Sequence, residues 1–262
     1  MRIGWVMDEV TYKGGAEYDA DLLMASAPSG IEVIRAVDRV IPTDVDGYVV
    51  GNCVGYGADI IEALERKPVI KRIYDMWPHG NEVLRRWLLD CAQLLIPVSP
   101  IQTERASWNA QAPTLCVPCA VEVEQYRVAA DAAGNDRYGH VWIGRLFPGK
   151  GVGAVQRWAD KNRTVVDVYG FGPDLDILEE PCRYGGELEP DAVADTLARY
   201  ETFVFLPTET DPCPRSVIEA WSAGCELVVN NNVGTLYWIQ HEPQALENAS
   251  VLFWDAVKEV IK

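Results

Sequence analysis

Apolar residues along the chain gather in short runs that alternate with longer amphipathic stretches. Near-continuous apolar runs are typical of strands buried on both faces, and stretches with a period near 3.6 residues are typical of helices. In the first half, the sequence predicts strands at 2–7, 31–37, 47–53, 68–75, 94–99 and 114–119, with helices at 16–27, 58–66, 81–92 and 102–109.

The same alternation is repeated after residue 140. Strands are expected at 140–144, 164–170, 202–207 and 225–231, with helices at 153–162, 190–200 and 216–224. Parallel strands need long crossover connections, which are usually helices. The sequence therefore predicts an α/β protein built from doubly wound parallel sheets.

Residues 127–140, RVAADAAGNDRYGH, interrupt the alternation, because they contain no strong apolar run. We predict an N-terminal domain over 1–126, a linker over 127–139 and a C-terminal domain over 140–248, each near the usual domain size. Ligands of such sheets bind at the carboxyl ends of the strands, so we expect the site in the cleft between the two domains. Residues 249–262 are a candidate for a helix that crosses back onto the N-terminal domain.

The charge balance limits the partners that the protein can have. The 262 residues include 23 Lys and Arg against 39 Asp and Glu, a formal net charge of −16. This disfavours a protein that binds nucleic acid phosphates or an anionic membrane surface through a broadly basic face.

The sequence supports neither a membrane-spanning or secreted protein nor a zinc-binding one. No apolar run approaches the roughly 18 residues of a membrane span, and Asp8 and Glu9 interrupt any signal peptide, so we expect a cytoplasmic protein without a transmembrane segment. The seven cysteines are dispersed. Cys116 and Cys119 form a CxxC pair, but neither a second pair nor a neighbouring His completes a zinc site, so no metal site is expected.

A glycine-rich loop follows the first strand of the second half. Its sequence, GRLFPGKG at 144–151, has the GxxxxGK spacing of a Walker A loop, but Gly151 stands where a Ser or Thr would bind Mg²⁺. Arg145 and Lys150 flank the loop at a helix N-terminus, where free N–H groups, the helix dipole and two cations together suit a diphosphate. A plain glycine turn with two solvated cations is the structural alternative.

Two acidic residues follow the strand that ends at Pro207. Asp211 lies in the loop after it, and Glu219 lies in the first turns of the next helix. A carboxylate accepts from two hydroxyls at once, which suits the adjacent hydroxyls of a ribose or another sugar. Compensation of the helix dipole is the simpler explanation for Glu219.

Segments in both halves resemble family 4 retaining glycosyltransferases with the GT-B fold. In the second half these are GRLFPGKG, VVDVYGFGPD, YGGELEPDAVADTLARYETFVFLP and DPCPRSVIEAWSAGCELVVNNNVG. In the first half KGGAE, YDMWPHG, VSPIQTE and VPCAVEVEQY are similar to the family's glycine loop, HDMW segment, central strand and pre-linker turn. The resemblance covers nearly the whole chain. It implies two Rossmann-like domains that face each other across a cleft.

The resemblance also implies roles for individual residues. Arg145 and Lys150 match the basic pair that holds the donor diphosphate and stabilises the departing nucleotide. Asp211 occupies the place of the first acid of the family's E-x7-E motif, which faces the donor sugar, and Glu219 matches the second, which binds the ribose. As catalytic residues we therefore expect Arg145, Lys150 and Asp211.

Other candidates follow from the same resemblance. Glu209 competes with Asp211 for the role of the first acid, and Tyr74 stands where the HDMW segment has its His. The expected donor-binding residues are Gly14, Gly15, Gly170, Gly172, Pro173, Glu187, Glu209, Cys213, Pro214, Arg215, Ser216 and Glu219. The acceptor-side candidates are Tyr74, Asp75, Trp77 and His79.

The implied activity is transfer of a sugar from a nucleoside diphosphate to a hydroxyl acceptor, with retention of anomeric configuration. We expect a UDP- or GDP-linked donor, no cofactor and no essential metal. The acceptor options are a glycan, a lipid-linked glycan or a hydroxymethylated DNA base, with nucleic acid entering only as acceptor. A P-loop-like nucleotide hydrolase and a non-catalytic nucleotide-sugar-binding protein are the alternatives. A monomer or weak dimer is expected.

Overall fold

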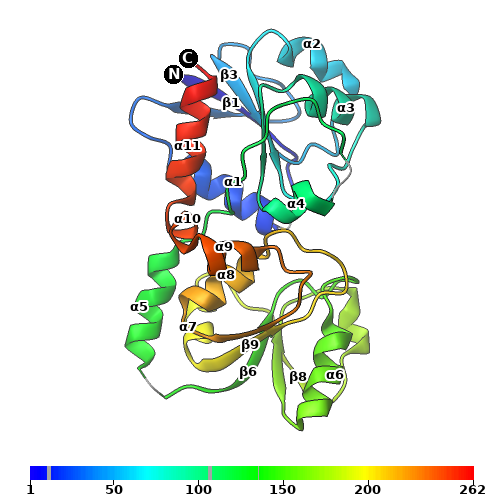
Figure 1. Ribbon diagram of the computed structural model, residues 1–262, viewed down its shortest axis with the longest axis vertical. Coiled ribbons are helices and arrows are strands. Elements are labelled where there is room, and N and C mark those ends of the chain that lie inside the picture. The colour runs from blue at the N-terminus through cyan, green and yellow to red at the C-terminus, as the bar shows by residue number, and fades with distance from the viewer. Residues whose placement is uncertain (11–12, 106–107, 135) are drawn as a thin grey trace. The chain divides into compact units, whose positions relative to one another are not determined.

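The computed structural model describes residues 1–10, 13–105, 108–134 and 136–262, which divide into two compact units (Figure 1). Unit 1 consists of Met1–Ala120 together with Gln240–Lys262, and unit 2 consists of Val121–Ile239. Both are parallel sheets with crossover helices. This is the α/β arrangement that the alternation of apolar runs predicts.

Unit 1 contains a five-stranded sheet in the order β2-β1-β3-β4-β5, with every neighbouring pair parallel. All residues of β3, β4 and β5 are buried, which explains the continuous apolar runs of β3 and β5, while β4 also contains the buried Lys71 and Arg72. The strands are β1 (Arg2–Val6), β2 (Glu32–Arg35), β3 (Gly47–Val50), β4 (Val69–Ile73) and β5 (Leu94–Pro97). The connecting helices are α1 (Gly15–Ala25), η1 (Ala58–Ile60), α2 (Ile61–Leu64), α3 (Glu82–Cys91) and α4 (Pro100–Arg105).

The last helix of the chain, α11 (Ala249–Val260), completes the core of unit 1. Phe253 and Trp254 pack in one cluster with Trp5, and the indole N–H of Trp254 donates to the Leu23 carbonyl of α1 at 2.8 Å. In Figure 1, α11 is the red helix that lies beside α1. The preceding α10 (Pro243–Glu247) groups with unit 1 as well, whereas most of α9 (Thr235–His241) groups with unit 2.

Unit 2 contains a second parallel sheet in the order β10-β9-β6-β7-β8. Its strands are β6 (Tyr138–Ile143), β7 (Val166–Tyr169), β8 (Cys182–Gly186), β9 (Tyr200–Phe205) and β10 (Glu226–Val229). The other elements are α5 (Val123–Ala133), α6 (Val152–Asn162), η2 (Pro173–Ile177), α7 (Ala192–Ala198) and α8 (Arg215–Ser222). The two strand orders are the two common ones of doubly wound folds.

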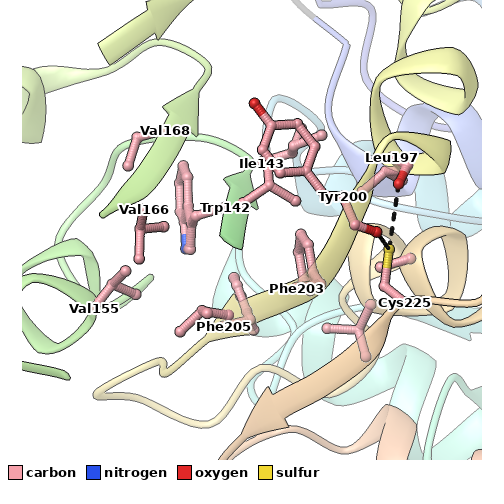
Figure 2. Packing of buried hydrophobic residues seen from close by; sticks show 14 of the residues in the cluster. Trp142, Ile143, Val155, Val166, Val168, Leu197, Tyr200, Phe203, Phe205 and Cys225 are labelled. Atoms are coloured by element: carbon pink, nitrogen blue, oxygen red, sulfur yellow. Dashed lines mark hydrogen bonds between the residues drawn. The ribbon is translucent and has the colours of Figure 1, made fainter. Parts of the chain in front are cut away.

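Large aromatic side chains fill the core of unit 2 (Figure 2). Trp142 stacks on Phe205 with ring centroids 6.3 Å apart, and Phe205 stacks on Phe203 at the same spacing. The buried Cys225 thiol lies 3.4 Å from the Leu197 carbonyl oxygen. The contact between Trp142 and Phe205 links β6 to β9, and the candidate site is built at the ends of these two strands.

The region expected as a linker, 127–139, is mostly helical, because α5 continues to Ala133. Tyr126 and Ala129 pack on the core of unit 2. The Ala-rich helix therefore buries one narrow stripe of small and aromatic side chains, which forms no long apolar run in the sequence. The boundary between the units lies earlier, between Ala120 and Val121. Residue 135 of the expected linker lies outside the described residues.

Three smaller expectations also change. Residues 114–119 are not a strand: Thr114 makes one isolated parallel bridge to Leu95, and Pro113 and Pro118 restrict further pairing. Strand β8 was not expected, because it is an edge strand with a single buried residue. The helix expected over 102–109 is described only as α4, and 106–107 lie outside the described residues.

Candidate functional site

The carboxyl edge of the sheet in unit 2 brings two distant loops together. From β6 the chain proceeds to β7 on one side, and β9 later pairs with β6 on the other side. The connections of a doubly wound sheet diverge at such a point, and ligands bind there. The loop 144–151 follows β6 and the loop 206–214 follows β9, so the topology places Lys150 and Asp211 at one edge.

Lys150 and Asp211 form an ion pair that links these two loops. The Lys150 ammonium donates to Asp211 Oδ2 at 2.5 Å. The Lys150 side chain is 41% exposed, whereas that of Asp211 is 12% exposed. Beside this pair, the Thr208 N–H donates to the Gly149 carbonyl at 2.9 Å. A cation and a carboxylate therefore lie together at this edge, and the Lys150 side chain is partly exposed to solvent.

The loop glycines allow the backbones to pack against one another. Gly151 has a φ of +85°, and a Cβ atom built on it would lie 2.0 Å from the Leu206 carbonyl oxygen. A Cβ on Gly170 would lie 1.8 Å from the Gly144 carbonyl oxygen. No Ser or Thr fits at position 151, so this loop cannot supply the hydroxyl through which a P-loop binds Mg²⁺.

Arg145 lies in the same loop, and two aromatic rings flank it. Its guanidinium carbon is 5.8 Å from the ring centre of Phe147 and 5.5 Å from that of Phe171. Phe147 follows β6 and Phe171 follows β7. These cation–π contacts orient a half-buried cation at the strand ends.

Asparagines that were not among the expected site residues fix the position of Asp211. The backbone N–H of Asp211 donates to the Asn232 carbonyl at 2.8 Å, and Asp211 pairs with Val233 in a parallel bridge. The side-chain amides of Asn230 and Asn232 both donate to the Pro207 carbonyl, at 2.9 and 3.0 Å. The run NNNVG after β10 carries this signal, since partly buried polar side chains need partners.

Glu209 lies near Asp211 but occupies a different place. Its backbone N–H donates to the Gly149 carbonyl at 3.3 Å, and a Cβ on Gly149 would lie 2.9 Å from Glu209 Oε2. The residue is exposed. Lys150 forms its ion pair with Asp211, so the two acids are not equivalent in the structure.

Glu219 lies on α8, where the Arg215 side chain contacts it. Arg215, one turn earlier, places Nη2 3.4 Å from Glu219 Oε1, and both side chains are mostly buried. The negative charge of Glu219 also acts on Tyr126 of α5. Burial raises the pKa of Tyr126, and the charge of Glu219 raises it further, so the phenol stays protonated.

The other donor-side candidates lie along the same edge. Cys213 and Pro214 are buried directly before α8, with Pro214 as its N-cap, and Ser216 is partly buried in the first turn. Gly170, Gly172 and Pro173 follow β7, and the Tyr184 hydroxyl donates to the Gly170 carbonyl at 2.9 Å. Glu187 is exposed after β8.

In unit 1, Gly14 is the N-cap of α1 and its N–H donates to the Glu17 carboxylate at 2.7 Å. Gly15 is the exposed first residue of that helix. Neither has the left-handed backbone that only glycine adopts easily. The close approach of a ligand to these two glycines stays a prediction.

The acceptor-side candidates follow β4 but differ in exposure. Tyr74 is buried, and the Arg72 guanidinium lies 5.5 Å from its ring centre. Asp75 is half-buried, whereas Trp77 and His79 are exposed. Tyr74 therefore lies in the interior of unit 1, while Trp77 and His79 are accessible to a ligand.

A buried ion pair in unit 1 was not expected from the sequence. Arg72 and Asp19 are both fully buried, with Nε and Oδ2 3.2 Å apart. Arg72 also donates to the carbonyls of Val117 and Pro118, and Asp19 accepts from the Ala120 N–H. The pair therefore ties α1 and β4 to the segment where unit 1 gives way to unit 2.

Unit 1 also has an open cavity at the carboxyl edge of its sheet. Its volume is about 570 Å³, and none of the acceptor-side candidates lines it. The lining residues are Asp8, Glu9, Val10, Asp38, Arg39, Gly55 and Tyr56.

Across the part of the chain that the structure describes, no three His, Cys, Asp or Glu side chains are grouped to hold a metal ion. Within those same ranges, no helix is long and apolar enough to cross a membrane. Burial raises the pKa of the Cys116 thiol to about 11, which makes the thiolate, the form that binds metals, rare at neutral pH.

Comparison with known proteins finds similar folds among solved structures only. No family model and no curated protein matches the sequence. Among solved structures, HepE from Anabaena in complex with UDP-glucose is 15% identical, with a TM-score of 0.65, and the match covers 100% of this chain and 96% of that one. AviGT4, a glycosyltransferase involved in avilamycin A biosynthesis, is 15% identical with a TM-score of 0.66, covering 95% and 88%.

A third similar structure is T4 phage BGT in complex with its UDP-glucose substrate. It is 13% identical with a TM-score of 0.54, and the match covers 99% of this chain and 89% of that one. The matches extend over both units. The chain thus has the two-domain, Rossmann-like GT-B fold of these glycosyltransferases, as the sequence resemblance implied.

Proposed function

We propose that the protein is a glycosyltransferase that moves a sugar from a nucleoside diphosphate to a hydroxyl-bearing acceptor. The observation that carries the proposal is the contact between Lys150 and Asp211 at the carboxyl edge of unit 2, with Arg145 and Glu219 on neighbouring segments of that unit. Similar folds bind UDP-glucose in HepE and in the phage enzyme, which supports a UDP-linked donor.

In this proposal Arg145 and Lys150 bind the donor diphosphate. Negative charge grows on the diphosphate as the sugar bond breaks, and cations already in place stabilise that charge without reorganisation. Asp211 holds the Lys150 ammonium at the loop before the donor arrives. It then faces the sugar, where its carboxylate can accept a hydroxyl.

We propose retention of anomeric configuration, in keeping with the resemblance of the sequence motifs. The acceptor hydroxyl would attack from the face that the diphosphate leaves, and the diphosphate would take its proton. Because Arg145 and Lys150 neutralise the leaving group, we propose that binding and transfer need no metal ion. The acceptor would bind through unit 1, where Trp77 and His79 are exposed.

The decisive experiment is a thermal-shift panel of UDP, GDP, ADP and CMP, each with and without EDTA. A ligand at 100 times its dissociation constant stabilises a protein by about 2.7 kcal/mol, which such a panel resolves. We expect one nucleoside diphosphate to raise the melting temperature, with or without EDTA. Lys150→Ala and Glu219→Ala should weaken that response.

Activity then requires incubation with the matching nucleotide sugar and a mixture of glycan acceptors. Product formation, or slow release of free sugar, would support an enzyme, and the anomeric configuration of the product tests retention. Binding without either reaction would favour a nucleotide-sugar-binding protein instead. If no nucleotide binds, the proposal is wrong.

A further inference from the structure

The cavity of unit 1 lies where the strand order of its sheet reverses. Its lining residues come from the loops after three neighbouring strands, with Asp8, Glu9 and Val10 after β1, Asp38 and Arg39 after β2, and Gly55 and Tyr56 after β3. Ligands of doubly wound sheets bind at such a point. The volume of about 570 Å³ is in the range of pockets that enclose small organic molecules.

Backbone hydrogen bonds hold the Asp8 carboxylate in place. It accepts from the N–H of Val54 at 2.6 Å and from that of Gly55 at 2.9 Å. The N–H of Asp8 donates in turn to the Asn52 carbonyl at 2.7 Å. These bonds tie the loop after β1 to the loop after β3. A carboxylate has about four lone-pair sites, so Asp8 can still accept from a ligand.

The Tyr56 hydroxyl makes one long contact with the described residues. Tyr56 is 4% exposed, and its hydroxyl lies 3.5 Å from the Met7 carbonyl oxygen. Hydroxyl hydrogen bonds usually span about 2.5–3.0 Å, and buried polar groups usually have a partner. Burial raises the pKa of Tyr56, and the charges of Asp8 and Glu9 raise it further, so the phenol keeps its proton. A ligand in the cavity can complete the bonding of this group.

The charges of the lining favour a cation. The carboxylates of Asp8, Glu9 and Asp38 outnumber the single guanidinium, that of Arg39. Glu9, Asp38 and Arg39 are exposed, and within the described residues no ion pair neutralises them. A cavity of this volume holds a group larger than a bare ion, so an organic ammonium fits it better than a metal ion does.

We propose that this cavity binds a polyhydroxylated ligand that carries a protonated amine, an amino sugar or an aminocyclitol, and that this ligand is the sugar acceptor. Its role as acceptor rests on the proposed function. The ammonium binds among the carboxylates of Glu9 and Asp38, and ligand hydroxyls bind Asp8 and Tyr56. In the transfer, one ligand hydroxyl oxygen forms the bond to the sugar and gives its proton to the departing diphosphate. Phosphorylated acceptors are rejected, because like charges repel.

The test titrates isotopically labelled protein with three probes and follows its amide NMR signals. Glucosamine carries the ammonium, N-acetylglucosamine keeps the ring without the charge, and glucose 6-phosphate reverses the charge. The amides of Val54 and Gly55, which donate to Asp8, report binding at the cavity.

Two double variants separate the cavity from the overall charge. Glu9→Gln with Asp38→Asn removes two charges from the lining. Glu65→Gln with Glu259→Gln is the matched control, because it removes two charges from exposed positions of unit 1 that do not line the cavity. Thermal melts verify that both variants fold.

We expect glucosamine to shift both amide signals and to bind about tenfold or more tightly than N-acetylglucosamine, because hydrogen bonds to charged groups are the stronger ones. The cavity variant should lose about tenfold in glucosamine affinity, and the control should keep the wild-type value. Glucose 6-phosphate should leave both signals unshifted. With the matching nucleotide sugar present, glucosamine should be glycosylated with a higher kcat/KM than N-acetylglucosamine, measured by mass spectrometry.

Equal affinities for glucosamine and N-acetylglucosamine, or equal glucosamine binding by the cavity variant and wild type, would overturn the assignment of the cavity. Glucosamine that binds there but receives no sugar from a protein that glycosylates another acceptor would overturn its role as acceptor. A protein that binds no nucleoside diphosphate would instead reject the proposed function, while the cavity titration, which needs no nucleotide, would stand.

Discussion

Lys150 and Asp211 are 61 residues apart in the sequence, yet Lys150 Nζ lies 2.5 Å from Asp211 Oδ2. The loops that carry them follow β6 and β9, the two strands between which the order of the sheet reverses. In the structure, the Asp211 carboxylate is the partner of the Lys150 ammonium. A bound diphosphate would compete with Asp211 for that ammonium.

This competition predicts opposite effects for the two partners. Lys150→Ala should weaken binding of the nucleoside diphosphate about tenfold or more, because it removes a charge-assisted contact. Asp211→Asn should leave that affinity unchanged or raise it, while sugar transfer falls. Calorimetry measures the diphosphate affinity of each variant, and a transfer assay measures its activity. An equal loss of diphosphate affinity in both variants would contradict the competition.

Neither variant should unfold the protein. The Lys150 side chain is 41% exposed, and ion pairs that water screens in this way are worth at most about 1 kcal/mol. Urea unfolding of Lys150→Ala should therefore give a free energy within about 1 kcal/mol of wild type. A larger loss would mean that the pair is structural.

Gly151 should be intolerant of any side chain. Gly151→Ala is expected to lower the free energy of unfolding by about 2 kcal/mol or more, because φ is +85° and the new Cβ would meet the Leu206 carbonyl oxygen at 2.0 Å. Gly153→Ala is the control, since its Cβ meets only Arg157 at 3.6 Å. The control should be neutral or stabilising by up to about 1 kcal/mol. Equal melting temperatures for the two variants would contradict the packing argument.

Gly151→Ser also tests the P-loop alternative. If the loop were a nucleotide hydrolase site, a hydroxyl at this position would improve Mg²⁺-dependent hydrolysis. We expect a destabilised protein without nucleotide hydrolysis, measured as phosphate release with and without Mg²⁺. If this variant hydrolyses UTP, GTP or ATP, the result would support the hypothesis of a P-loop-like nucleotide hydrolase.

Removing one partner of the buried Arg72–Asp19 ion pair should lower the free energy of unfolding strongly. Arg72→Met leaves a fully buried carboxylate without its charge partner, which costs about 3–5 kcal/mol in urea unfolding. The double variant with Asp19→Leu should lose less than the sum of the single losses, because it leaves no charge behind. Arg66→Met, in an exposed pair with Glu62, is the control and should change stability by about 0.5 kcal/mol or less. Additive losses at the buried pair would exclude this coupling.

Asp167 should contribute to the loss of stability in acid. Burial acts to raise its pKa, but hydrogen bonds from Arg183 and Tyr200 outweigh this effect, so the folded pKa lies below the ordinary value. A depressed pKa gives stability that is present above the unfolded value, about 3.9, and is lost as the pH falls through the folded one. Asp167→Asn should thus be less stable than wild type at pH 6, and the difference should shrink toward pH 3. A difference that stays constant over this range would show that the charge of Asp167 is not involved.

The sequence alone determined the architecture and the identity of most candidate residues. Continuous apolar runs predict strands buried on both faces, and the helical patterns between them require parallel pairing, so two doubly wound sheets followed from local periodicity. The motifs around Lys150, Asp211 and Glu219 predicted a ligand site at the second sheet. Local spacing could not show which of Asp211 and Glu209 contacts the cation.

Tertiary structure decided the relationships between residues distant in sequence. The stretch 127–139 lacks a long apolar run, and the packing of α5 against α7 and α8 stabilises a helix up to Ala133. Tyr126 belongs to a motif that the sequence resemblance places in a turn, yet it is buried on α5, which packs against α8. Tyr74 occupied a motif position, but the fold buries it beside Arg72. Sequence periodicity reports which face of an element is buried, whereas the partner across that face is fixed only when the elements pack.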